Sequence, residues 1–240
     1  MRLKITLKGN DNLKIPYNYN YSLSSLIYNK IADSNLAKKI HSSSSFKFFT
    51  FSQLYIYQKK FNENSIIAKD GIISFYLSSP SGTLIKNFAQ GFLKNEVEFL
   101  NKKMNVMNVE MLKTPDFDNK TTFNTISPII IRSKREINGE IKIWDLPPSD
   151  DFFRGIESNL IKKYCTFNKI DNIDNHINIC SEMANVKRKR ISINKGLKTT
   201  YHRAYMLDLI LEGDVDLIKF AYDAGLGEKN SMGFGMVELR

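Results

Sequence analysis

Residues 225–238 read Gly-Leu-Gly-Glu-Lys-Asn-Ser-Met-Gly-Phe-Gly-Met-Val-Glu, which places four glycines within eleven positions. Apolar residues at helical spacing precede this stretch at 215–222, and an apolar stretch follows at 234–239. We therefore expect a loop that leaves a helix and opens a strand. A dinucleotide-binding fingerprint has the opposite order, and the Gly-Lys-Ser/Thr of a Walker loop is missing, so both motifs are excluded. Such glycines allow close backbone approach, and the N–H groups exposed in such a loop can hold phosphate oxygens. The alternative to this phosphate-binding role is a structural one, in which Gly225 caps the helix and Gly233 and Gly235 form a bulge.

The first 112 residues predict the order strand, helix, strand, strand, helix, strand. Leu3, Ile5 and Leu7 alternate with polar residues, which is typical of a strand with one buried face. Residues 23–31 carry apolar positions at helical spacing, with Ser22 as the expected N-cap. The other expected elements are a short helical turn at 35–40, a helix at 85–100, and strands at 47–57, 66–77 (bent at Asp70-Gly71) and 104–112. This is the order of the ferredoxin-like split βαβ unit.

The second half repeats that order after a turn-rich linker at 114–120. Asn138-Gly139 lies between Ile131 and residues 141–143, which is the strongest short signal for a hairpin, so this half carries an inserted hairpin. Strands are expected at 123–131, 187–193, 201–211 and 234–239, helices at 153–164 and 215–222, and loop with a short helix at 168–185. We therefore predict an α+β protein of two tandem ferredoxin-like (βαββαβ) domains, spanning residues 1–115 and 122–240.

The chain is strongly basic, with a net charge of +10 and a pI near 9.4, so its field attracts polyanions such as nucleic acid. In a β-ribbon, alternation would send Arg188 and Arg190 to one face and Lys187 and Lys189 to the other. We expect two clusters to bind nucleic-acid phosphates with salt-dependent affinity, Lys187, Arg188, Lys189 and Arg190 in one and Arg132, Lys134 and Arg135 in the other. Solvated surface charge, or a genome biased towards Lys, Asn and Ile codons, is the alternative explanation.

Composition also disfavours several classes of protein. No stretch reaches the roughly 18 to 20 uncharged apolar residues of a membrane helix, and the N-terminus alternates like a strand, so we expect a cytoplasmic protein without a membrane partner. Cys165 and Cys180 lack metal-ligand spacing and are expected to be free thiols. The close carboxylate pairs, Asp116 with Asp118 and Asp150 with Asp151, lie in turn-forming sequence, so we expect neither a metal site nor a cofactor.

The glycine-rich stretch resembles the C-terminal loop of the CRISPR-associated endoribonucleases that process repeat transcripts, a tandem ferredoxin-like family of the RAMP superfamily. The similarity extends to Leu211-Glu212-Gly213-Asp214, to Ser127-Pro128-Ile129 and to the run from Tyr21 to Tyr28. It implies that CRISPR repeat RNA is the substrate, and it leaves other interference-complex proteins and a second copy of the chain open as partners. It further implies RNA contacts in the loop at Gly225, Gly227, Lys229, Asn230, Ser231, Gly233 and Gly235.

RNA carries its own nucleophile, the 2′-hydroxyl. Metal-free cleavage therefore needs a base for that group, an acid for the 5′-oxygen and positive charge near the phosphorane. Histidine suits the proton steps because its pKa lies close to neutral. The resemblance makes His41 the catalytic histidine, with Lys47 and Tyr28 as its partners, whereas position alone would make His41 a surface residue beside a loop. His202 is the rival catalyst, and His176 is expected on the surface.

Three functions remain open from the sequence. The favoured one is a metal-independent endoribonuclease that leaves a 2′,3′-cyclic phosphate and a 5′-hydroxyl. The second is a catalytically inactive RNA-binding subunit of a CRISPR interference complex, and the third is a structural ferredoxin-like pair with incidental charge. Cleavage separates the first two, and salt-sensitive affinity for repeat RNA separates both of them from the third.

Overall fold

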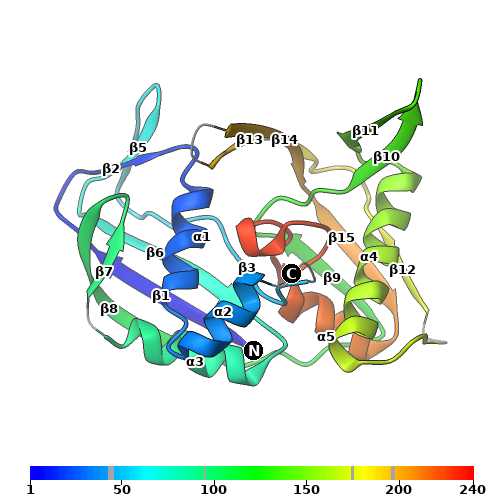
Figure 1. The fold of residues 1–240 in the computed structure, drawn as a ribbon, viewed down its shortest axis with the longest axis horizontal. Helices are drawn as coiled ribbons and strands as arrows, with labels where there is room; N and C mark the ends of the chain where they lie inside the picture. The colour runs from blue at the N-terminus through cyan, green and yellow to red at the C-terminus, as the bar shows by residue number, and fades with distance from the viewer. Residues whose placement is uncertain (43–45, 95, 174–175, 196–197) are drawn as a thin grey trace.

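Two α+β units lie side by side in the computed structural model, and the glycine-rich loop with its short 3₁₀-helix η1 (Asn230–Met232) lies where they meet (Figure 1). The structure describes residues 1–42, 46–94, 96–173, 176–195 and 198–240, and for residues 39, 41, 42, 195 and 198 it describes the backbone only. Each unit has its own apolar core between a sheet and helices.

The N-terminal unit is built on a five-stranded antiparallel sheet in the order β3-β6-β1-β8-β7. In β1 (Arg2–Lys8), Leu3, Ile5 and Leu7 are buried and share one core with the apolar faces of α1 (Asn20–Asn29) and α3 (Gly82–Phe92). Strands β2 (Leu13–Pro16), β5 (Ser65–Ala68) and β4 (Lys59–Phe61) form a small sheet of their own. The remaining elements are α2 (Ser34–Ser42), β3 (Thr50–Phe51), β6 (Ile72–Ser78), β7 (Glu96–Phe99) and β8 (Lys102–Leu112).

Four expectations for this unit were wrong in detail. The helix predicted over 85–100 ends at Phe92, and Val97 and Phe99 are buried with a period of two on strand β7. Only two residues of the stretch 47–57 form a strand, β3. The stretch 66–77 is two strands of different sheets, because Gly71 turns the chain with a φ of 65°. Ser22 is not the N-cap, since α1 begins at Asn20.

The C-terminal unit has a four-stranded sheet in the order β12-β15-β9-β16. If the strands of this sheet are numbered along the chain, the order is 2-3-1-4, and β3-β6-β1-β8 of the N-terminal sheet gives the same order. This is the ferredoxin-like arrangement, so the predicted tandem fold class is confirmed, whereas the domain ends at 115 and 122 stay a prediction. The elements are β9 (Lys120–Thr125), α4 (Asp150–Asn168), β12 (Ile177–Cys180), β15 (Asp208–Gly213), α5 (Val215–Ala224) and β16 (Val237–Leu239).

Two hairpins extend this unit. Asn138-Gly139 forms the turn between β10 (Arg132–Ile137) and β11 (Glu140–Asp145), as predicted, with positive φ at both residues. Strands β13 (Lys187–Lys195) and β14 (Lys198–Met206) form the second hairpin, a two-stranded ribbon. The strand expected over 201–211 is therefore two strands, which belong to the ribbon and to the sheet. Strand β12 lies where only loop and a short helix were expected, because its alternation covers just four residues.

All four glycines of the loop have positive φ, and other groups lie where their side chains would be. A Cβ on Gly235 would lie 1.8 Å from the carbonyl oxygen of Leu226, and one on Gly227 would lie 2.6 Å from that of Ile130. The N–H groups of Leu226, Glu228 and Gly235 donate to backbone carbonyls of this unit at 2.8, 2.9 and 2.9 Å. Contrary to expectation, these three N–H groups do not form a phosphate nest, because protein carbonyls already accept from them.

Lys163 on α4 holds the loop from inside the C-terminal unit. Its side chain is 1% exposed, and Nζ donates to the carbonyl oxygens of Gly225 and Gly227 (3.3 Å to the latter) and to Asn230 Oδ1 at 3.0 Å. The Asn230 amide in turn donates to two loop carbonyls at 3.0 Å each, which joins the two sides of the loop. Burial lowers the pKa of Lys163 to about 7.

Side chains of the N-terminal unit hold the loop from the other side. Asn20 and Ser24 of α1 donate to carbonyl oxygens of η1 at 3.0 and 2.7 Å. Arg2 is 4% exposed, donates to two backbone carbonyls of the C-terminal unit at 3.1 and 2.7 Å, and lies 3.7 Å above the ring of Tyr222. The loop is therefore bonded to both units at once.

We expect Gly235→Ala to destabilise the protein much more than Gly139→Ala. The φ angles are 76° and 77°, so both alanines carry the same left-handed strain of about 1–2 kcal/mol, but nothing lies within 4 Å of a Cβ on Gly139. The clash with Leu226 should cost a further ~1–3 kcal/mol. Urea unfolding measures both values, and equal losses would show that the loop does not need this close approach.

We expect Lys163→Met to lower the free energy of unfolding at pH 7 by about 3 kcal/mol, because buried loop acceptors lose their donor. The pKa of Lys163 is about 7 in the folded chain against 10.5 as the ordinary value. Between these pH values the unfolded chain binds the extra proton, so wild type should gain stability over the variant as pH rises, by at most about 1.4 kcal/mol per pH unit. Denaturation of both proteins at several pH values tests this, and a constant difference would contradict it.

Candidate active site

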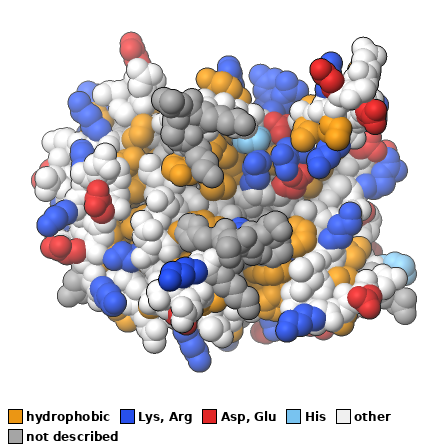
Figure 2. Space-filling model, in the orientation of Figure 1, with side chains coloured by type: hydrophobic (Ala, Val, Ile, Leu, Met, Phe, Trp, Pro, Cys, Tyr) orange, Lys and Arg blue, Asp and Glu red, His pale blue; other side chains and the backbone are white. Residues whose placement is uncertain are grey.

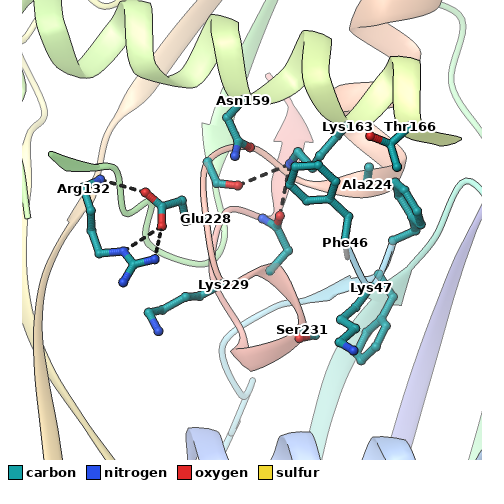
Figure 3. A pocket seen from close by; sticks show the side chains of 14 residues that line it. Phe46, Lys47, Arg132, Asn159, Lys163, Thr166, Ala224, Glu228, Lys229 and Ser231 are labelled. Carbon is teal, nitrogen blue, oxygen red and sulfur yellow. Dashed lines mark hydrogen bonds and ion pairs between the residues drawn. The ribbon is translucent and has the colours of Figure 1, made fainter. Parts of the chain in front are cut away.

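A cavity of ≈ 480 Å³ lies between the two units, beside the glycine-rich loop (Figure 3). The N-terminal unit contributes residues 46–49, and the C-terminal unit contributes α4, Arg132 and residues around η1. Among its described lining residues, one is anionic, Glu228, and four are cationic: Lys47, Arg132, Lys163 and Lys229. The cavity therefore favours an anionic ligand.

The N-terminal unit brings two predicted catalytic residues to this region. The Lys47 ammonium donates to the carbonyl oxygen of Ile40, and burial lowers the pKa of Lys47. Tyr28 of α1 forms a side-chain hydrogen bond with Ser231, which lines the cavity, and burial raises the pKa of the Tyr28 hydroxyl. His41 follows Ile40 at the C-terminal end of α2, and its side chain lies outside the described part of the chain. The catalytic roles of these residues stay a prediction.

Lys229 is the loop residue best placed to hold an added anion. Burial, and then the nearby Arg132 guanidinium, lowers the pKa of Lys229, and its side chain points away from Lys163 (Figure 3). Within the described residues its ammonium forms no ion pair, whereas Arg132 already pairs with Glu228 at 2.5 and 2.6 Å. Asn230 serves the loop itself, as shown above.

Sequence reasoning missed the contribution of α4 to the cavity. Asn159, Lys163 and Thr166 all line it from one face of this helix. The signal was available, since Lys163 continues the buried row of Phe152, Ile156 and Leu160 at helical spacing. A charged residue at an apolar position of a helix needs a buried partner, and here the partners are loop carbonyls.

The two predicted basic clusters lie on the hairpins. Arg188 and Arg190 pair across the ribbon with Tyr205 and Arg203, so they share one face, as predicted from alternation. Blue side chains gather around the two hairpins in the view of Figure 2. The exposed members of the clusters are Lys187, Arg188, Lys189, Arg190, Lys134 and Arg135, whereas Arg132 is half-buried in its ion pair.

His202 is a poor candidate for proton transfer. Its ring is 5% exposed, and Nδ1 lies 3.5 Å from Asp145 Oδ1. Burial lowers the pKa of His202, and Nε2 is buried without a hydrogen-bond partner among the described residues. His176 is exposed, as predicted.

The other predicted features have plain structural roles. Asp150 and Asp151 lie in the first turn of α4, where Asp151 pairs with Arg154 at 2.8 Å. Cys165 and Cys180 are free thiols, as predicted. In the described ranges, no three His, Cys, Asp or Glu side chains are grouped as metal ligands, and no helix is long and apolar enough to span a bilayer.

The chain matches known proteins over its whole length. Residues 14–110 match the family described as CRISPR-associated protein Cas6, N-terminal, and residues 112–239 match CRISPR associated protein Cas6, C-terminal. It is 37% identical to CRISPR-associated endoribonuclease Cas6 1 of Methanocaldococcus jannaschii, over 99% of this chain and 92% of that one. It is 33% identical to CRISPR-associated endoribonuclease Cas6 of Pyrococcus furiosus, over 100% and 90%.

Solved structures agree with the sequence matches. A structure titled "CRISPR associated protein Cas6" has a TM-score of 0.85 at 36% identity and covers 100% of this chain and 99% of its own. Another, titled "An RAMP protein binding different RNA substrates", has a TM-score of 0.85 at 26% identity, with the same coverage. On both the sequence and the fold, this chain belongs to the Cas6 family of CRISPR-associated proteins.

Proposed function

We propose that the chain cleaves CRISPR precursor transcripts within their repeats, without a metal ion, to give guide RNAs. One observation carries the proposal: Lys47 of the N-terminal unit and Lys229 and Ser231 of the C-terminal loop line one cavity, with Tyr28 bonded to Ser231. Relatives at 37% and 33% identity are CRISPR-associated endoribonucleases by name.

The proposed reaction is an attack by the 2′-oxygen of RNA on the adjacent phosphorus. A base removes the 2′-hydroxyl proton, the bond from phosphorus to the 5′-oxygen breaks, and an acid protonates that oxygen. The products are a 2′,3′-cyclic phosphate and a 5′-hydroxyl. His41 supplies one of these proton transfers, in line with the resemblance, and either Tyr28 or Lys47 supplies the other.

Positive charge is the second requirement of this reaction. Burial lowers the pKa of Lys47 and of Lys229, because it makes the charged form of each ammonium group less favourable. The negative charge of a phosphorane in the cavity would favour the charged forms and be stabilised by them in return. The basic hairpins would hold the flanking RNA by its phosphates.

A binding-only role is the second candidate. A relative from Pyrococcus furiosus, 29% identical over 100% of this chain, is named "Putative CRISPR-associated endoribonuclease-like protein Cas6", and the solved structure with 26% identity is titled for RNA binding alone. Proteins of the same fold therefore include some whose names or titles do not state that they cleave RNA. Under this alternative the chain holds repeat RNA inside an interference complex and leaves it intact.

We expect wild type to cut an end-labelled CRISPR repeat RNA at one site in the presence of EDTA. His41→Ala should slow the cut by about 10²- to 10⁴-fold, the usual contribution of general acid–base catalysis, and leave RNA affinity unchanged. His176→Ala is the matched control, because His176 is exposed and is not among the described residues that line the cavity. Tight binding without any cut would favour the binding-only role, and equal rates in all three proteins would move the active site away from His41.

We expect the double change Arg188→Gln and Arg190→Gln to weaken repeat-RNA binding and to flatten its salt dependence. Removal of one phosphate contact should reduce the slope of log affinity against log salt by about 0.7 to 0.9. Lys102→Gln with Lys103→Gln is the matched control, since it removes two exposed charges from β8 in the other unit. Identical slopes for the two double variants would mean that only net charge matters.

A further inference from the structure

We propose that a second cavity, between the β10–β11 and β13–β14 hairpins, binds an unpaired RNA nucleotide by stacking its base on Trp144 or Tyr201 and holding its phosphate with arginines. The cavity measures ≈ 520 Å³. The proposal rests on the proposed function in one respect, namely that RNA is the ligand of this chain. The described residues that line this second cavity are Trp144, Asp145, Arg188, Lys189, Arg190, Tyr201, His202 and Arg203.

The register of the ribbon gathers three guanidinium groups and one ring on its outer face. Arg190 lies opposite Arg203, Arg188 lies two residues before Arg190, and Tyr201 lies two residues before Arg203, so all four project from the same face. These arginines and Tyr201 are exposed. The inner face instead carries Ile193 and Ala204, which pack against Phe234 of the glycine-rich loop. The cavity is thus lined by Arg188, Arg190, Tyr201 and Arg203 from the outer face and by Lys189 and His202 from the inner face.

Asp145 fixes the other wall of this cavity. Its Oδ2 accepts from the backbone N–H of Arg203 at 2.7 Å, and its Oδ1 lies 3.5 Å from Nδ1 of His202. These contacts anchor the end of β11 against β14 and place Trp144, the neighbour of Asp145, beside the ribbon. The single carboxylate of the described lining is therefore already engaged by protein groups, and four basic residues line the same cavity.

Two aromatic rings with adjacent guanidinium groups are the reason to infer a base. Arg135 lies 5.7 Å from the ring centroid of Trp144, and Arg190 lies 4.6 Å from that of Tyr201. Rings that alternate with cations are the arrangement by which proteins hold single-stranded nucleic acid, because bases stack on the rings while phosphates meet the charges. The bases of a duplex are hidden in their own stack, so an unpaired nucleotide is the ligand that fits.

The second cavity adjoins the candidate active site. Arg132, which lines the first cavity, pairs across the β10–β11 hairpin with Asp145, which lines the second. A nucleotide held by Trp144 and Tyr201 would place the chain of the RNA next to the cavity where we propose that it is cut.

Trp144 is the one tryptophan among the 240 residues, so its emission reports directly on this cavity. The test titrates the protein with an unstructured RNA about ten nucleotides long, a length that one single-strand site covers, and with the same RNA as a blunt duplex. We expect the single strand to quench Trp144 emission and the duplex to leave it unchanged. A duplex that binds and quenches equally would overturn the selection for unpaired bases.

Affinity measured by anisotropy of labelled RNA gives the second readout. Tyr201→Ala and Trp144→Ala should each weaken single-strand binding by about 5- to 150-fold, and Trp144→Phe should keep most of the affinity because it keeps a ring. Tyr201 is 59% exposed, so its variant tests the site even if the change at Trp144 disturbs the fold. Tyr57→Ala, at an 81% exposed tyrosine of the N-terminal unit, is the matched control. Tight binding with unchanged emission and unchanged affinity in these variants would overturn this site alone, whereas no binding of any RNA by wild type would overturn the proposed function with it.

Discussion

No side chain fits between the backbones of residues 226 and 235, and the arrangement of both units follows from that contact. The close approach closes residues 226–235 into a compact loop, which Lys163 and Asn230 hold from the C-terminal side. In this shape the carbonyl oxygens of η1 accept the hydrogen bonds that Asn20 and Ser24 donate. The glycines thus act through packing, and they place Lys229 in the lining of the cavity between the two units.

The same cavity combines three lysines that burial has made less basic. Desolvation by burial is the main reason why the pKa is lowered for each of Lys47, Lys163 and Lys229. Lys47 and Lys163 donate to backbone carbonyls, whereas Lys229 forms no ion pair within the described residues. A cavity of this kind binds an anion well, because burial disfavours the protonated lysines and a nearby negative charge stabilises them.

Sequence patterns predicted the parts of the fold that depend on local chemistry. The alternation of Leu3, Ile5 and Leu7 and the Asn138-Gly139 turn gave β1 and the β10–β11 hairpin, because period and turn type are local properties. Strand β7 was read as helix, since Phe99 fits both periods, and only pairing with β8 decides between them. Helical spacing in α4 indicates that Lys163 is buried, but its partners are carbonyls 62 and 64 positions away, and no local pattern identifies them. For the site, resemblance supplied Tyr28, His41 and Lys47, and the structure adds the cavity that Lys47 lines together with Ser231, the partner of Tyr28.

The hydrogen bonds that join α1 to η1 have a bearing on how the molecule folds. They connect residues 212 and 207 positions apart, so they close almost the longest loops that this chain allows. A contact between residues so far apart in the sequence costs the chain a large loop-closure entropy, so such contacts are expected to form late in folding. Each ferredoxin-like core has its own apolar cluster and can assemble first. A newly made chain would then acquire two finished halves before it acquires a cavity between them, which delays any RNA chemistry until folding is complete.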